Sequence, residues 1–184
     1  MNIRPAIEAD AEAITGVHIA SMQEAYQSLF RREALAQIDT HDRTQRWREH
    51  LARATSVTVL AEADGHLVGF ADFGACRDED VSPGAVGELL AMYVRPDAWG
   101  RSVGRALMWE TLERLQSDGF AEVVLWVIEE NQRALDFYRR FGFIRDGSVR
   151  HRTMYGTETT VVRLHRRAGV ETAEPVTEAF LPRE

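Results

Sequence analysis

Hydrophobic positions follow two different spacings along this chain, one typical of strands and one typical of helices. Near the N-terminus they predict a short strand at 2–4, a helix that starts after Asp10 and runs to about Leu29, and a second helix over 32–53 with a break near Asp39. The rest of the predicted order is strands at 56–61, 67–75 and 88–94, a helix that ends before Gly119, a strand at 121–127, a helix over 131–141, and strands at 143–150 and 159–165.

The order of these elements predicts the fold class. Strands and helices are mixed rather than strictly alternating, so we expect an α+β domain with a mixed, mostly antiparallel central sheet of about six to seven strands, flanked by helices. Ala63-Asp-Gly-His66 predicts a hairpin turn, because Asp-Gly tolerates positive φ. Residues 1–168 are expected to form this domain. Residues 169–184 lack apolar periodicity and are expected to form a flexible tail or to pack on a partner.

Composition narrows the class of protein. The chain has 184 residues, of which 45% are hydrophobic and 28% charged, as in an ordinary globular domain. A net charge of −7 argues against a nucleic-acid partner, which needs clustered excess cations. The single cysteine, Cys76, excludes an intramolecular disulfide and a cysteine-rich metal site. No apolar stretch approaches the ~20 residues of a membrane span, and no signal peptide is visible, so we expect a cytoplasmic protein.

The segment Trp99-Gly-Arg-Ser-Val-Gly-Arg-Ala-Leu107 carries the first chemical signal. It connects a strand to an amphipathic helix, where backbone N–H groups point out of the helix N-terminus. Arg101 and Arg105 add guanidinium groups that suit a diphosphate. A plain strand–helix connection, in which the glycine eases packing, fits such a turn equally well.

A second segment favours the phosphate interpretation. Asn131-Gln-Arg-Ala-Leu-Asp-Phe-Tyr-Arg-Arg-Phe-Gly-Phe143 begins with a residue suited to capping a helix and ends with a glycine where a helix should stop. The spacing puts Asn131, Ala134 and Tyr138 on one face of that helix.

Together the two segments resemble the GCN5-related N-acetyltransferase (GNAT) family. That family's acetyl-CoA loop typically reads Arg/Gln-x-x-Gly-x-Gly/Ala, and its next helix reads Asn-x-x-Ala-x-x-x-Tyr before a Gly-Phe strand start. Both occur here in the family's order over residues 86–145, with a weaker likeness near residues 2–11. Two positions depart from the pattern: Trp99 stands at the usual Arg or Gln, and Ser102 replaces the first loop glycine.

The resemblance implies a cofactor and a set of site residues. It implies an acyl-CoA N-acyltransferase-like fold in which acetyl-CoA is the co-substrate, and the pantetheine arm pairs with the backbone near Met92 and Val94. It gives Tyr138 the role of the acid that assists the departing thiol. No cluster of metal ligands is visible, so no metal is expected. The residues expected to bind the donor are Met92, Val94, Arg101, Ser102, Val103, Gly104, Arg105, Asn131 and Ala134.

Transfer to an amine also calls for a base. A lysine-like amine has a pKa of ~10.4, so only about one molecule in 10³ is unprotonated at pH 7. Glu88 is the candidate base: strand alternation would place it on one face with Leu90, Met92 and Val94, and apolar neighbours would raise its pKa. Many members of the family have Glu at this place. A solvated position at the strand end is the alternative for Glu88, and core packing is the alternative for Tyr138.

The acceptor is expected to be a small amine, an amino-acid derivative or a protein N-terminus. Its pocket is expected to lie among the first two helices, the loop over 77–85 and the last strands. The basic run over 163–167 is interpreted as a solvated face. Dimers are common in similar proteins, so a homodimer is a further expectation. Two other functions compete: a CoA-binding regulatory module without catalysis, and a nucleotide-binding domain, which the missing Walker lysine disfavours.

Overall fold

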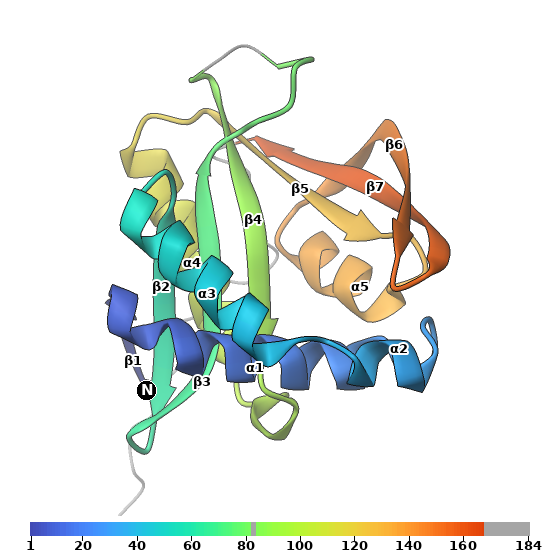
Figure 1. The fold of residues 1–184 in the computed structure, drawn as a ribbon. Helices are drawn as coiled ribbons and strands as arrows, with labels where there is room; N and C mark the ends of the chain where they lie inside the picture. Colours follow the sequence, from blue (N-terminus) through green and yellow to red (C-terminus); the bar gives the residue numbers. More distant parts are fainter. Residues whose placement is uncertain (82–83, 168–184) are drawn as a thin grey trace, which may run out of the picture.

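A computed structural model describes residues 1–81 and 84–167 of the protein, and the predicted C-terminal tail lies outside this part. Its centre is a seven-stranded sheet in the order β1-β2-β3-β4-β5-β7-β6 (Figure 1). The strands are β1 (Asn2–Pro5), β2 (Val57–Ala63), β3 (His66–Ala75), β4 (Val86–Val94), β5 (Glu122–Ile128), β6 (Ile144–Met154) and β7 (Thr157–Arg167). The helices are α1 (Ala11–Ala25), α2 (Arg32–Ala36), α3 (Thr40–Arg53), α4 (Val103–Ser117) and α5 (Gln132–Arg140), with 3₁₀ turns at Glu8–Asp10 and Pro96–Ala98.

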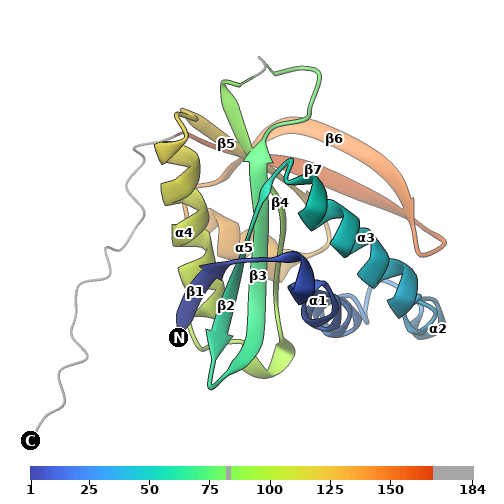
Figure 2. The ribbon, with the colours of Figure 1, turned by 60° about the vertical axis from the view of Figure 1, so that its left-hand side comes forward.

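Helices cover both faces of the sheet. Figure 2 shows α4 on one face and α1 with α3 on the other. On the α4 face, buried residues of the helix such as Leu107 and Leu115 form one core with β2–β5 and β7. On the opposite face, Ile14, Trp47 and Phe70 form a second core. None of the helices in the described residues is long and apolar enough to cross a membrane.

Strand pairing confirms the predicted fold class. All neighbouring strands are antiparallel except β4 and β5, which run parallel. This parallel pairing covers only Val86–Leu89 against Glu122–Leu125. Beyond it the C-terminal parts of β4 and β5 diverge and no longer pair with each other, which opens the middle of the sheet (Figure 1).

Local signals place most element ends where they were predicted. The Asp64-Gly65 turn has positive φ at both residues, as the hairpin requires. Asn131 caps α5 by accepting a hydrogen bond from the Ala134 N–H at 3.1 Å. Asp39 separates α2 from α3, because its carboxylate accepts from the Asp42 N–H and so starts a new helix. The first helix is shorter than predicted: α1 ends at Ala25, and a turn follows.

The predicted alternation of side chains along β4 is wrong. In the pairing of β3 with β4, Asp72 lies opposite Ala91 and Phe73 opposite Leu89, so Leu90 is an extra residue in β4. This β-bulge breaks the alternation of side chains. Leu89, Met92 and Val94 therefore pack on the α4 face, and Glu88 does not share the face of Met92 and Val94.

Candidate active site

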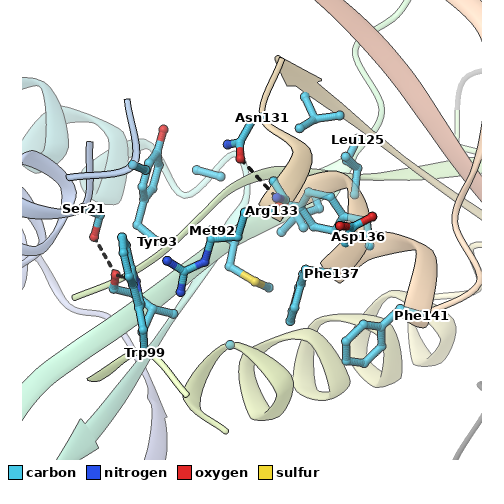
Figure 3. Close-up of a pocket in the computed structure, with 18 of the residues that line it drawn as sticks. Ser21, Met92, Tyr93, Trp99, Leu125, Asn131, Arg133, Asp136, Phe137 and Phe141 are labelled. Atoms are coloured by element: carbon cyan, nitrogen blue, oxygen red, sulfur yellow. Dashed lines mark hydrogen bonds between the residues drawn. The ribbon is translucent and has the colours of Figure 1, made fainter. Parts of the chain in front are cut away.

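A cavity of about 1020 Å³ occupies the opening between β4 and β5. It is walled by α1 on one side and by α4 and α5 on the other, and Figure 3 shows its side chains converging from these elements. The lining includes nine of the predicted residues: Met92, Val94, Ser102, Val103, Gly104, Arg105, Asn131, Ala134 and Tyr138. Arg101 is exposed and is not part of the lining.

The N-terminus of α4 presents free backbone donors to this cavity. No side chain caps the helix, and its first backbone hydrogen bond runs from the Ala106 N–H to the Ser102 carbonyl at 3.0 Å. The described residues offer no hydrogen-bond acceptor to the N–H groups of Val103, Gly104 and Arg105. Such a cluster of unpaired donors at a helix N-terminus binds anions, phosphate in particular.

Ser102 adopts a backbone conformation that glycine favours. Its φ is +61° and its ψ is 8°, in the left-handed region. A residue with a Cβ pays about 1–2 kcal/mol for this conformation. The position is the one at which the resemblance implied glycine, and the turn geometry explains why.

Replacing Ser102 by glycine should therefore stabilise the protein. Glycine relieves the strain but is more flexible in the unfolded chain, which offsets part of the gain, so we expect about 0.5–1 kcal/mol. A rise in Tm of about 1–4 °C in thermal unfolding would show it. Ser117→Gly, within α4, serves as the control and should lower Tm. An equal loss in both variants would contradict strain at Ser102.

The end of β4 turns backbone groups toward the opening. The Arg95 N–H bonds β3 at the Val68 carbonyl, so by strand alternation the peptide groups of Val94 and Met92 point away from β3. The Val94 carbonyl is already occupied: it accepts from the Trp99 indole N–H at 2.7 Å and from the Ser21 hydroxyl at 2.9 Å (Figure 3). The Val94 N–H and the peptide groups of Met92 are left facing the cavity.

Tyr138 projects from α5 into the same cavity. Its ring packs edge-on against Phe137 and Phe143, with ring centres 5.4 and 6.0 Å away. Its hydroxyl has no hydrogen-bond partner within the described residues. Burial raises the pKa of this hydroxyl, so Tyr138 stays protonated at neutral pH. It is placed to donate a hydrogen bond to a ligand in the cavity.

Glu88 lines a second cavity, of about 670 Å³. Its side chain is largely buried, and one carboxylate oxygen accepts from the Arg77 N–H at 3.2 Å. Burial raises the pKa of Glu88, which moves the carboxyl toward the range of a general base. Glu88 and Tyr138 do not line the same cavity. The two cavities share Leu90 and Trp126, so they meet at the bulge in β4.

An ion cluster centred on the buried Arg163 and Asp78 forms a wall of the smaller cavity, and it corrects one prediction. Arg163, predicted to lie on a solvated face, is buried and donates to Asp78, Asp80 and Asp146 at 2.6–2.9 Å. Arg150 donates to Asp78 at 2.8 Å and lies over the Trp126 ring. Burial raises the pKa of Asp78, but these hydrogen bonds more than offset it and leave the pKa below its ordinary value.

Three possible metal ligands lie close together beside this wall. Ligand atoms of Cys76, Asp78 and Glu88 come within 4.8 Å of one another. The Asp78 oxygens are engaged by Arg150, Arg163 and the Trp126 indole, and burial raises the pKa of the Cys76 thiol. The carboxylate is thus committed to cationic partners, and the thiol favours its protonated form. These three residues therefore fit a role in the hydrogen-bonded wall of the cavity better than a role as metal ligands.

The chain matches the family model described as acetyltransferase (GNAT) family over residues 19–143. An uncharacterized N-acetyltransferase of Bacillus subtilis, YuaI, is 29% identical over 141 residues, which are 77% of this chain and 79% of that protein. A mycothiol acetyltransferase of Frankia casuarinae is 40% identical over 90 residues, 46% of this chain but only 26% of its own length.

Solved structures share the fold. The ribosomal-protein-alanine N-acetyltransferase of Brucella melitensis superposes with a TM-score of 0.70 at 24% identity, covering 91% of this chain and 99% of that one. The PaiA N-acetyltransferase of Thermoplasma acidophilum, solved in complex with coenzyme A, gives 0.66 at 19% identity, covering 90% and 98%. The family match and the opened sheet agree with the resemblance of the two motifs: this chain belongs to the GNAT family of acetyltransferases.

Proposed function

We propose that the protein transfers the acetyl group of acetyl-CoA to a primary amine by direct attack, with both substrates bound at once. The observation that carries this proposal is the pair of cavities that meet at Leu90 and Trp126. The larger one holds the free amides of α4 and suits the donor. The smaller one holds Glu88 and suits the amine.

The reaction follows from what each side can do. Glu88, directly or through a water, accepts the proton that the ammonium group must lose before it can attack. The amine nitrogen then bonds to the thioester carbonyl carbon, and the C–S bond breaks as the tetrahedral intermediate collapses. The electron pair of that bond stays on sulfur, and Tyr138 donates a hydrogen bond to the departing thiolate. The nitrogen of the new amide releases its remaining extra proton to water. The α4 amides anchor the diphosphate throughout.

The acceptor is a small amine, an amino-acid derivative or a peptide N-terminus. The smaller cavity is lined mostly by charged side chains, which favours a polar acceptor over an apolar one. The relatives named mycothiol acetyltransferases support a small molecule, although this chain spans only about a quarter to a third of their length. A homodimer remains a prediction.

Calorimetry and a transfer assay test the proposal. The purified protein should bind CoA and acetyl-CoA, and it should release CoA from acetyl-CoA when an acceptor from a panel of amines and peptides is present. Omitting the acceptor controls for hydrolysis. Binding without transfer to any amine would favour the regulatory module instead. A protein that binds neither CoA nor acetyl-CoA would contradict both functions.

A further inference from the structure

Arg133 is a cation in the donor cavity that forms no salt bridge with any described residue. It is the second residue of α5, and within the described residues it forms no ion pair and no hydrogen bond. Its one close partner is the indole of Trp99: the guanidinium carbon lies 3.5 Å from the ring centre. Burial lowers the pKa of Arg133, and the charge of Glu24, which does not contact it in a salt bridge, offsets this only in part.

The Arg133–Trp99 stack spans the opening of the sheet. Trp99 is fixed to the end of β4 by its hydrogen bond to the Val94 carbonyl, and the loop that follows it leads into α4. Arg133 comes from α5, on the other side of the opening. Figure 3 shows its side chain reaching past Met92 toward the Trp99 ring. The guanidinium is thereby held over Trp99, four residues before Val103, the first residue of α4.

We propose that Arg133 is a phosphate-binding residue of the donor site, and that Trp99 holds it in place for the diphosphate. This inference rests on the proposed function, since the diphosphate is that of CoA. A ligand whose diphosphate binds the α4 amides would lie close to the Arg133 guanidinium, which its stacking on Trp99 has already oriented. A guanidinium can donate two parallel hydrogen bonds to such an anion.

The proposal reassigns the role that the sequence suggested for Arg101. Arg101 lies two residues after Trp99 and so is nearer to the helix in sequence, yet it is exposed and lies outside the cavity lining. Arg133 lies within that lining although it is far away in sequence. The two arginines therefore form a matched pair for substitution, since both are exposed and neither has an ion-pair partner in the described part of the chain.

Calorimetric titration with CoA distinguishes the two arginines. Arg133→Gln should weaken CoA binding about tenfold or more, the size expected for a charge-assisted contact, and should flatten the salt dependence of the affinity. Arg101→Gln should change it less than about twofold, as expected for an exposed charge. Equal effects of the two substitutions would overturn the proposal. If the unsubstituted protein ignored CoA, the proposed function itself would fail.

An acetyl donor without phosphate shows whether Arg133 binds the phosphates or only shapes the donor cavity. S-acetylpantetheine lacks the diphosphate, so its KM should be the same for Arg133→Gln and the unsubstituted protein. A parallel rise in its KM would mean that Arg133 shapes the cavity, and would overturn phosphate binding.

Trp99 is tested by a double-mutant cycle. By itself, Trp99→Leu should weaken CoA binding, but it should add little to the effect of Arg133→Gln, whereas Trp99→Phe should retain most of the affinity. Additive losses would contradict the role of Trp99 as a positioning residue.

Discussion

Replacing Glu88 by glutamine should lower kcat/KM for acetyl transfer by about 10²–10⁴-fold, the range found for loss of a general base. Glutamine keeps the size of the side chain and can still accept from the Arg77 N–H, but it cannot take up a proton. Steady-state kinetics with a saturating donor would measure the loss. Glu79→Gln is the matched control, because Glu79 lines the same cavity but is exposed, and it should leave kcat/KM nearly unchanged.

The pH dependence gives the same substitution a second readout. The base works only when it is ionised, and burial raises the pKa of Glu88 above its ordinary value. The kcat/KM of the unsubstituted enzyme should therefore rise with pH along an acid limb that lies higher than for an exposed glutamate. Glu88→Gln should remove that limb. An unmoved profile would show that another base, or none, is used.

The thermal stability of Glu88→Gln shows whether its loss of activity is catalytic or comes from unfolding of the variant. Between the ordinary pKa of glutamate and the raised pKa of Glu88, the native state binds more protons than the unfolded state, so this group makes stability fall as pH rises. At neutral pH the ionised Glu88 is thus a burden on the fold. Glutamine removes that burden, and the variant should unfold at the same temperature as the parent or higher.

Replacing Tyr138 by phenylalanine should lower kcat by about 10- to 100-fold, less than the loss at Glu88. The thiol of CoA resembles cysteine, with a pKa of about 8.5, so its thiolate leaves with modest help. The raised pKa of Tyr138 means that the hydroxyl assists as a hydrogen-bond donor over the whole neutral range. CoA affinity should stay unchanged, because the aromatic ring that packs on Phe137 is kept.

A matched tyrosine sharpens this test. Tyr26 also lines the donor cavity, and burial raises its pKa too, but it comes from the turn after α1 rather than from the motif helix. Tyr26→Phe should leave kcat within a fewfold of the parent. A kcat near the parent value for Tyr138→Phe, with unchanged binding of acetyl-CoA, would remove Tyr138 from the mechanism.

The sequence predicted most of the fold because its signals are local. Asp64-Gly65 specifies a tight hairpin, Asn131 and Gly142 bound one helix, and Gly119 ends another. Each of these residues acts within four or five positions of itself. The α1 end was missed for the same reason: the apolar periodicity continues past Ala25, and nothing between Tyr26 and Leu29 marks a stop.

The site was predicted only in part, because its remaining features depend on contacts distant in sequence. The bulge at Leu90 carries no glycine or proline to reveal it, yet it moves Glu88 to the other face of β4. Arg163 pairs with Asp78 and Asp80, which are more than 80 residues away in sequence. The sequence near Arg163 shows no acidic partner, and the basic run over 163–167 was therefore predicted to be solvated. The stacking of Arg133 on Trp99 joins two segments that are distant in sequence, and no local pattern predicts it.

The divergence of β4 from β5 has a consequence for solubility. It leaves unsatisfied strand edges in the middle of the sheet, and bare edges of this kind invite other chains to add strands and aggregate. Here α1, α4 and α5 wall the recess, so a neighbouring sheet cannot reach these edges. The geometry that admits a ligand arm thus also keeps strands of other chains from pairing with these two edges.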